Sequence, residues 1–205
     1  MTKEKLALDV DDVVIDTTDS VRVFVNERSG RALTVADYRA PGHYWSYYEG
    51  VWERAGIKDE GYMAEFQEMM AADQSFLQPV PGATRFLPTI ATELEVIGVT
   101  SRPPEQQRAT LERLETLFGS ILQDVVFLGR ADGARETKGE ACRRLGAKYL
   151  LEDNVDHCIS TRAFGVTTPL LFGELGWQQD APDDLIRTPQ WHHVAEYFDG
   201  LKHVA

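Results

Sequence analysis

The sequence has little cysteine and little positive charge, and each shortage argues against a class of protein. Its two cysteines, Cys142 and Cys158, show neither paired spacing nor neighbouring metal ligands, which argues against a disulfide framework and a structural zinc site. Lysine and arginine number 21 against 33 acidic residues, for a formal net charge of -12. Because a nucleic-acid backbone requires a basic surface, we expect no binding to nucleic-acid polymers.

Long apolar runs are also missing. No run of eighteen apolar residues occurs, and the opening MTKEKLALDV has too short an apolar stretch for the core of a signal peptide. We therefore expect a cytoplasmic protein that does not bind membranes. The chain has 205 residues, 43% of them hydrophobic, and can bury a substantial core as one domain with a modest insertion.

The most informative stretch is LALDVDDVVID at positions 6–16. An apolar run leads into Asp9, Asp11 and Asp12, as expected for a buried strand of a parallel sheet that ends in acid. Carboxylates clustered at such a strand end repel one another and are costly to desolvate, so we expect a divalent cation to compensate them. The alternative, on these residues alone, is a solvated acidic turn.

The segment after this strand changes to helical patterning. Asp16 can cap a helix whose apolar residues repeat at helical spacing. A second helical stretch runs from 61 to 70, and no convincing strand pattern occurs before residue 79. We expect 17–78 to form a small helical cap inserted after the first strand, while 1–16 and 79–205 form the catalytic core.

Beyond residue 82, helical and strand-like runs alternate, which is typical of a doubly wound α/β domain. Pro88 either kinks the helix around it or marks the start of that helix. The tail from Gly173 is expected to be rich in loops, with one terminal helix. The predicted fold class is α/β, with a Rossmann-like parallel sheet as the core. The expected strands are 95–100, 124–128, 149–151 and 166–172, and the expected helices include 105–118 and 137–145.

Polar residues suited to phosphoryl chemistry lie at the junctions that follow these strands. The carboxyl ends of parallel strands meet at one edge of a sheet, so Asp9, Thr100 and Asp153 are expected to converge. Asp9 can act as a nucleophile, and Asp11 as a general acid and base two residues on. The Thr100 hydroxyl can donate a hydrogen bond to an anionic group, and Lys138 can supply that group with a positive partner. Taken separately, Thr100 is more typical of a strand-end cap and Lys138 of a solvated helix residue. Their order in the chain after Asp9 and Asp11 favours a functional role for both.

The ordered set resembles the haloacid-dehalogenase-like (HAD) superfamily of aspartate-dependent phosphohydrolases. The motifs are DVDDV at 9–13, VIGVTSRP at 96–103, Lys138 within ETKGEACRRLG, and LLEDN at 150–154. The resemblance spans nearly the whole chain. The helical cap, the PGA junction and the acidic pair of the last motif resemble the 5'-nucleotidase branch, which includes 5'(3')-deoxyribonucleotidases.

This resemblance implies a role for each motif residue. Asp9 would be the nucleophile and a magnesium (Mg²⁺) ligand, and Asp11 the acid and base and a ligand through its backbone carbonyl. Asp153 would be the third ligand. Thr100 and Lys138 would bind the transferring phosphoryl group. The implied cofactor is Mg²⁺, and the implied partner is a small phosphorylated substrate.

Two acidic residues beside the motif residues add negative charge to the expected metal site. Asp12 stands where many members of the superfamily have glycine, and it adds negative charge beside the metal site. Glu152 directly precedes Asp153 and could itself take the metal, directly or through water. We favour Asp153 as the ligand.

The substrate is decided by the cap and not by the motifs. Aromatic side chains of the cap could form a stacking platform for a nucleobase, or they could form the small core of the cap itself. We expect Trp45 and Tyr48 to bind substrate, and nucleoside monophosphates to be that substrate. The aromatic residues concerned are Trp45, Tyr47, Tyr48 and Trp52.

Ser101 and Arg102 follow Thr100 and are further candidates for substrate binding. Arg102 either supports a phosphate or pairs with a surface acid, and the sequence favours neither. His157 is expected to be an ordinary polar residue.

Other functions remain open on the same sequence. Sugar-phosphate hydrolysis, phosphonate hydrolysis and phosphomutase activity would use the same motifs. A dehalogenase would not need Asp11, and a non-catalytic binding protein would be expected to have lost one of the motif residues. A phosphoacceptor receiver module would have its lysine last, whereas here the final acidic motif follows Lys138.

Overall fold

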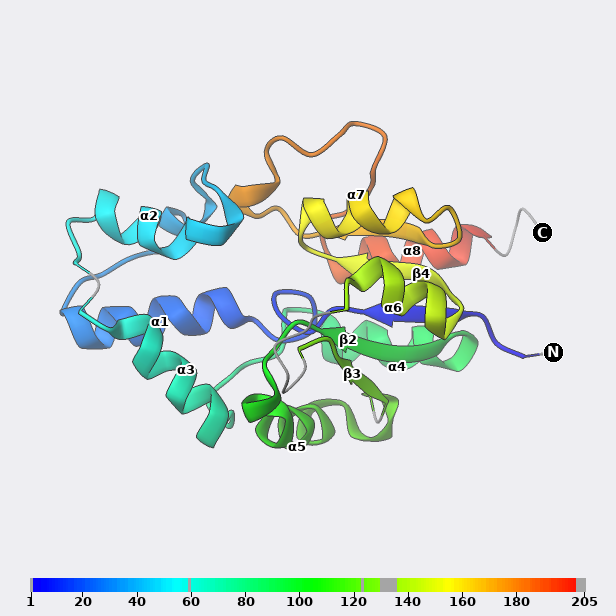
Figure 1. Cartoon of the computed structure of the whole chain (residues 1–205), viewed down its shortest axis with the longest axis horizontal. Helices are drawn as coiled ribbons and strands as arrows, with labels where there is room; N and C mark the ends of the chain where they lie inside the picture. The colour runs from blue at the N-terminus through cyan, green and yellow to red at the C-terminus, as the bar shows by residue number, and fades with distance from the viewer. Residues whose placement is uncertain (1, 59, 123, 130–135, 202–205) are drawn as a thin grey trace.

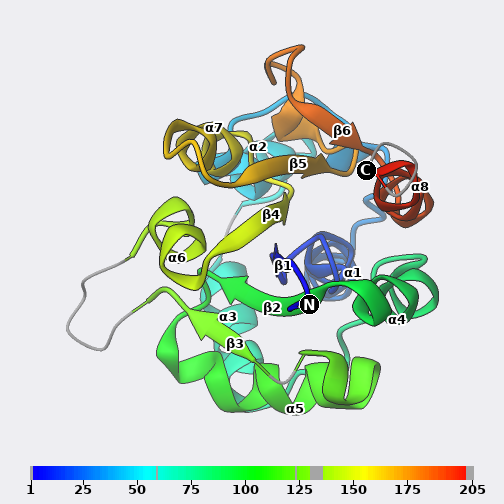
Figure 2. The ribbon, with the colours of Figure 1, turned by 90° about the vertical axis from the view of Figure 1, so that its right-hand side faces the viewer.

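Six strands form the central sheet in the computed structural model of this protein, which describes residues 2–58, 60–122, 124–129 and 136–201. All neighbouring strands are parallel, which confirms the predicted α/β class with a Rossmann-like parallel sheet. The strands are β1 (Lys5–Leu8), β2 (Glu95–Thr100), β3 (Val125–Phe127), β4 (Ala147–Glu152), β5 (Thr168–Phe172) and β6 (Ile186–Thr188). Their order across the sheet is β3-β2-β1-β4-β5-β6 (Figure 2).

Strand β1 lies in the middle of the sheet because its side chains are apolar on both faces. Leu6, Ala7 and Leu8 are fully buried, and β1 pairs with β2 on one side and β4 on the other. On one side of β1 the sheet continues with β2 and β3, and on the other side with β4, β5 and β6. In such a sheet the crevice beyond the carboxyl ends of the central strands is the place where ligands bind.

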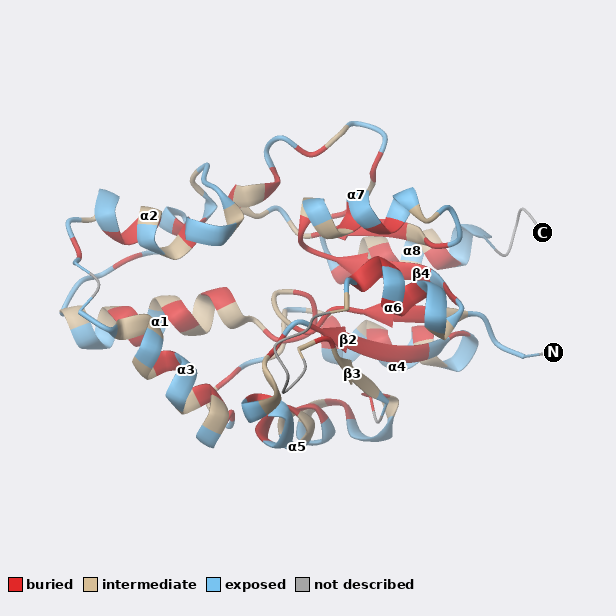
Figure 3. Cartoon of the chain, viewed as in Figure 1, coloured by how far each residue is buried: buried red, intermediate tan, exposed pale blue. Residues whose placement is uncertain are grey.

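Helices cover both faces of this sheet. Helices α6 and α7 lie on one face and α4 and α8 on the other, with α5 beside β3 (Figure 2). Strands β1, β2, β4 and β5 are largely buried, whereas the outer strands β3 and β6 are less so and the helices are buried mainly on their inward sides (Figure 3). The helices are α4 (Ala83–Glu93), α5 (Gln107–Phe118), α6 (Lys138–Leu145), α7 (Val155–Ala163) and α8 (Trp191–Leu201).

The sequence predicts most of these elements to within a few residues. Helix α4 begins at Ala83, so Pro88 lies inside the helix and does not mark its start. The tail differs from the prediction, because it contains the strand β6 before helix α8. With only three residues, β6 is too short to show a pattern. Part of the loop expected before α6 falls in 130–135, outside the described residues.

Among the described residues, three α-helices occupy the segment between β1 and α4. They lie at one end of the molecule, beyond the carboxyl ends of the strands (Figure 1). Asp16 caps the first of them by accepting a hydrogen bond from the Asp19 backbone N–H, and Gly30 ends it with φ of +67°. The helices are α1 (Thr17–Ser29), α2 (Tyr47–Arg54) and α3 (Tyr62–Ala72).

None of the helices described is both long enough and apolar enough to cross a membrane.

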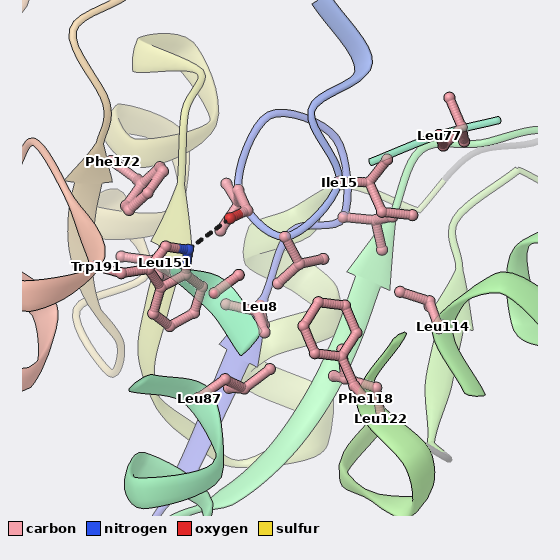
Figure 4. Packing of buried hydrophobic residues seen from close by; sticks show 14 of the residues in the cluster. Leu8, Ile15, Leu77, Leu87, Leu114, Phe118, Leu122, Leu151, Phe172 and Trp191 are labelled. Atoms are coloured by element: carbon pink, nitrogen blue, oxygen red, sulfur yellow. Dashed lines mark hydrogen bonds between the residues drawn. The ribbon is translucent and has the colours of Figure 1, made fainter. Parts of the chain in front are cut away.

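Trp191 links the loop after β1 to the last helix. Its indole Nε1 donates a hydrogen bond to the Val13 carbonyl at 2.9 Å, and its ring lies 5.7 Å from that of Phe172 (Figure 4). The side chain is only 1% exposed. Because Val13 belongs to the loop that carries Asp9 and Asp11, this packing holds that loop against the core.

We expect Trp191→Ala to lower the free energy of unfolding by about 3–5 kcal/mol, because it opens a large cavity and leaves the Val13 carbonyl without its donor. Urea denaturation measures the change. Trp45 is 74% exposed, so Trp45→Ala is the matched control and should change the stability by less than about 0.5 kcal/mol. Equal losses in the two variants would contradict this account of the core.

Candidate active site

The polar ends of three central strands meet at one edge of the sheet. Asp9 directly follows β1, Thr100 is the last residue of β2, and Glu152 is the last residue of β4. Because β1 pairs in parallel with both other strands, these ends lie side by side. Lys138 joins them as the first residue of α6, where Thr137 caps the helix in a capping box with Glu140.

Lys138 forms a buried bridge between two carboxylates. Its Nζ lies 2.7 Å from Asp9 Oδ1 and 2.5 Å from Glu152 Oε2. All three side chains are less than 10% exposed. Burial alone would lower the pKa of Lys138, but the two carboxylates outweigh it and raise that pKa above its ordinary value. The lysine therefore stays charged in the interior.

Glu152 is the second carboxylate of this bridge. Its Oε1 accepts a hydrogen bond from the Asn154 backbone N–H at 3.1 Å and lies 3.3 Å from His157 Nδ1. Burial opposes ionisation of Glu152, yet Lys138 and His157 lower its pKa to about 2. His157, which the sequence left as an ordinary polar residue, thus touches the carboxylate that holds Lys138.

Asp153, directly after β4, is a buried carboxylate. Its backbone carbonyl accepts hydrogen bonds from Gln178 Nε2 at 2.7 Å and Trp177 Nε1 at 3.2 Å. Within the described part of the chain, its carboxylate has neither a hydrogen-bond donor nor an ion-pair partner. Burial and the charges of Glu152 and Asp9 raise the pKa of Asp153 well above its ordinary value. The ionised form of this side chain is therefore disfavoured.

Asp9, Glu152 and Asp153 together fit a divalent cation. One carboxylate oxygen from each lies within 4.8 Å of the others, and all three residues are buried. The pKa of Asp9 is raised to about 7 by burial and by Glu152, in spite of Lys138. Oxygen ligands of this kind suit Mg²⁺, and its charge would remove the repulsion between Asp9 and Asp153. The donors present therefore match a magnesium ion.

Asp11 lies apart from this group and has its own cation. Arg102 Nε and Nη2 donate to the Asp11 carboxylate at 2.8–3.2 Å, and Thr17 Oγ1 donates to it at 2.5 Å. Burial would raise the pKa of Asp11, but the Arg102 guanidinium outweighs it and holds that pKa below its ordinary value. The sequence left open whether Arg102 binds phosphate or pairs with a surface acid; in the structure it pairs with Asp11 of the first motif.

The Asp12 carboxylate accepts local hydrogen bonds. It has φ of +54°, a region that aspartate tolerates better than most residues. Its carboxylate accepts from the backbone N–H of Thr18 at 2.8 Å and from Thr18 Oγ1 at 2.7 Å. Burial raises the pKa of Asp12 to about 7. The side chain ties the loop to the start of α1.

Thr100 and Ser101 differ in their surroundings. Thr100 is fully buried, and its Oγ1 accepts from the backbone N–H of Arg102 at 3.2 Å, which leaves the hydroxyl hydrogen available to an anion. Ser101, the next residue, is exposed.

The aromatic residues named from the sequence fall into two groups. Tyr47 and Trp52 are buried, and Trp52 Nε1 donates to Tyr38 Oη at 2.8 Å, so both belong to the packing of the helical segment. Tyr48 is half-buried, with its hydroxyl 3.0 Å from Thr18 Oγ1. Trp45 is exposed.

Two further aromatic residues lie near the carboxylates, and sequence reasoning did not single them out. Burial and the negative charges of Asp153 and Asp9 raise the pKa of Tyr44. The Tyr44 ring contacts the ring of Trp177 at 5.6 Å and that of Trp45 at 5.0 Å. Tyr44 was visible in the sequence as part of an aromatic cluster, whereas Trp177 lies in the tail and carries no motif.

Comparison with known proteins finds no matching family model and no matching curated protein. Solved structures do match. YfnB from Bacillus subtilis, described as a HAD-hydrolase bound to magnesium, has a TM-score of 0.63 at 13% identity, covering 97% of this chain and 100% of that one. The chain has the fold of HAD hydrolases. L-2-haloacid dehalogenase from Xanthobacter autotrophicus gives a TM-score of 0.63 at 13% identity, covering 98% of this chain and 100% of that one. A predicted phosphatase from Clostridium acetobutylicum gives a TM-score of 0.61 at 14% identity, covering 98% of this chain and 100% of that one.

We expect Mg²⁺ to stabilise the protein against unfolding, by about 2.7 kcal/mol at a concentration one hundred times its Kd. Asp153→Asn should lose most of this gain because it removes a ligand. Without metal the same variant should be at least as stable as the wild type, since it removes a carboxylate whose ionised form is disfavoured. Thermal denaturation with Mg²⁺ or with a chelator measures both effects.

Asp156→Asn is the matched control, because Asp156 is exposed on α7 and lies outside the acidic group. It should respond to Mg²⁺ as the wild type does. An undiminished response of Asp153→Asn would rule out this group as the metal site.

Proposed function

We propose that the protein is a magnesium-dependent phosphomonoester hydrolase that works through an aspartyl phosphate on Asp9. The observation that carries this proposal is the division of the carboxylates into two sets. Asp9, Glu152 and Asp153 lie together, with Lys138 bridging Asp9 and Glu152, while Asp11 pairs with Arg102. A nucleophile and a separate proton donor are what a two-step phosphoryl transfer requires.

Asp9 is oriented for attack by contacts to one of its oxygens. Its Oδ1 is held by Lys138 and by the Val10 backbone N–H at 2.8 Å. In the described part of the chain Oδ2 has no hydrogen-bond partner, so it is available to attack phosphorus. Bound Mg²⁺ would offset the negative charge of the carboxylates and of the phosphoryl group. Thr100 and Lys138 supply donors to the phosphoryl oxygens.

Asp11 moves the protons in both steps. As the bond from phosphorus to Asp9 forms and the ester P–O bond breaks, the leaving oxygen takes a proton from Asp11, which gives up its ion pair with Arg102 and is protonated before this step. In the second step it takes a proton from water, whose oxygen attacks phosphorus and releases phosphate and the Asp9 carboxylate. In the structure, Arg102 and Thr17 hold Asp11 as an ionised carboxylate.

The fold by itself does not distinguish a phosphatase from a dehalogenase, because L-2-haloacid dehalogenase shares it. The second carboxylate favours phosphoryl transfer. Displacement of halide needs no proton donor for the leaving group, whereas an alkoxide leaving group does. The presence of Asp11 two residues after Asp9 is therefore the feature that supports a phosphatase.

The helical segment 17–78 is proposed to act as a cap that selects the substrate, and nucleoside monophosphates are the proposed substrates. Support comes from the aromatic rings near the acidic group. Trp177 donates to the Asp153 carbonyl, and the Tyr44 ring packs on that of Trp177. The Tyr48 hydroxyl lies 3.0 Å from Thr18 Oγ1, and Trp45 is exposed next to Tyr44. Aromatic faces stack well on nucleobases.

We expect Asp9→Asn to abolish phosphate release while the protein stays folded, because the amide cannot attack phosphorus. Asp12→Asn is the matched control in the same loop. The raised pKa of Asp12 means that a neutral amide resembles the native side chain, so this variant should keep its activity within about tenfold. Phosphate release and circular dichroism measure the two properties. Turnover in Asp9→Asn at the level of the wild type would refute the mechanism.

A panel of nucleoside monophosphates, sugar phosphates and simple esters, assayed with and without Mg²⁺, tests the substrate class. We expect a nucleotide to have the highest kcat/KM and Mg²⁺ to be required. If simple esters are hydrolysed as well as any nucleotide, the nucleotide proposal falls and the phosphatase proposal stands. Release of halide from haloacids without release of phosphate would favour the dehalogenase.

A further inference from the structure

The ring of Tyr48 packs among other aromatic rings of the helical segment. It stacks on the ring of Trp52, with centroids 6.4 Å apart and an angle of 17° between the planes. The rings of Tyr38 and Tyr47 lie 6.1 Å and 6.3 Å from it, at angles of 53° and 71°. The protein itself thus covers part of the surface on which a nucleobase would stack.

The Tyr48 hydroxyl reaches the loop after β1 through Thr18. The hydroxyl oxygens of Tyr48 and Thr18 lie 3.0 Å apart, and Thr18 Oγ1 lies 2.7 Å from Asp12 Oδ2. The Thr18 backbone N–H donates to the other Asp12 oxygen at 2.8 Å, and the residue is 7% exposed. One chain of hydrogen bonds therefore joins α2, the start of α1 and the loop that carries Asp9 and Asp11.

This link is the polar contact that fixes α2 relative to the site. In the described part of the chain, it is the one hydrogen bond between α2 and the segment 9–29. Apolar packing is non-directional, whereas a hydrogen bond weakens steeply outside a narrow range of distance and angle. Tyr44 lies in the short turn directly before α2, and its ring packs on that of Trp177, whose indole donates to the Asp153 carbonyl. The placement of α2 therefore also sets that of the Tyr44 ring.

We propose that Tyr48 is a positioning residue that determines specificity: its hydroxyl holds α2 in place relative to the loop that carries Asp9, and so sets the space for the part of a substrate beyond its phosphoryl group. The inference rests on the proposed function. It gives Tyr48 a role other than the base stacking expected from the sequence, and it brings in Thr18, which lies outside every motif. It concerns phosphate esters whose leaving group reaches the helical segment, such as nucleoside monophosphates.

Thr18 separates this positioning role from direct contact between Tyr48 and the substrate. A substrate bound by the Tyr48 hydroxyl would lose that contact in Tyr48→Phe and keep it in Thr18→Val. If the two hydroxyls instead form one link, each variant breaks the same link, and the double variant loses little more than Thr18→Val does. Non-additivity in such a double-mutant cycle identifies residues that act through one another.

The test compares two esters in the presence of Mg²⁺: a nucleoside 5'-monophosphate, which has a large leaving group, and p-nitrophenyl phosphate, which has a small one. Loss of the hydrogen bond in Tyr48→Phe or Thr18→Val should lower kcat/KM for the nucleotide by about three- to tenfold. The value for p-nitrophenyl phosphate should fall less, so the ratio of the two values falls. The double variant should stay within about twofold of Thr18→Val. Thr18→Ser keeps the hydroxyl and should keep most of the ratio.

Tyr38→Phe is the matched control. Tyr38 belongs to the same group of aromatic rings and is 2% exposed, and its hydroxyl accepts a hydrogen bond from Trp52 Nε1 at 2.8 Å, within the helical segment. The variant should lower the free energy of unfolding and leave the ratio equal to that of the wild type. Urea denaturation establishes that each variant is folded, and Thr18→Val against Thr18→Ser decides the matter if Tyr48→Phe is not.

Three outcomes would overturn the inference in distinguishable ways. If the ratio is unchanged in the folded variants, or if the two losses multiply in the double variant, Tyr48 has no positioning role and the phosphatase proposal stands. If the wild type hydrolyses p-nitrophenyl phosphate as well as it does any nucleotide, there is no selectivity for Tyr48 to set. If the wild type hydrolyses neither ester with Mg²⁺ present, the proposed function and the inference fall together.

Discussion

The bridge that Lys138 makes between Asp9 and Glu152 is the interaction on which the site depends. Strands β1 and β4 lie side by side in the middle of the sheet, so their carboxylates are brought together in the interior. Removing a single partner from a buried ion pair leaves an uncompensated charge and is strongly destabilising. The capped start of α6 and the donors around Glu152 hold Lys138 at this point.

Two acids two residues apart acquire opposite properties from their neighbours. Burial and Glu152 raise the pKa of Asp9, while Arg102 lowers that of Asp11. Such a separation is typical of sites in which paired carboxylates do different work. The loop after β1 makes it possible, because Asp9 faces the ends of the strands whereas Asp11 is drawn towards Arg102 and Thr17. The same segment thus presents two carboxylates in different electrostatic surroundings.

Much of the fold and the core of the site could be predicted from local patterns. Continuous apolar runs reveal central strands, and the parallel arrangement then requires Asp9, Thr100 and Asp153 to end at one edge. The other features depend on contacts between distant parts of the chain. Arg102 meets Asp11 across 91 positions and Gln74 across 28, and Trp177 approaches Asp153 from the tail. No pattern within one segment encodes such pairings, and β6 is too short to show any.

The central claim is that Asp9 carries the phosphoryl group during turnover. Rapid acid quenching of the wild type with Mg²⁺ and a hydrolysed phosphate ester, followed by peptide mass spectrometry, tests it most directly. The account predicts one phosphoryl group on the peptide that contains Asp9, localised to that side chain and absent from Asp9→Asn. Hydrolysis with no phosphorylated intermediate, or with the group on another residue, would contradict it.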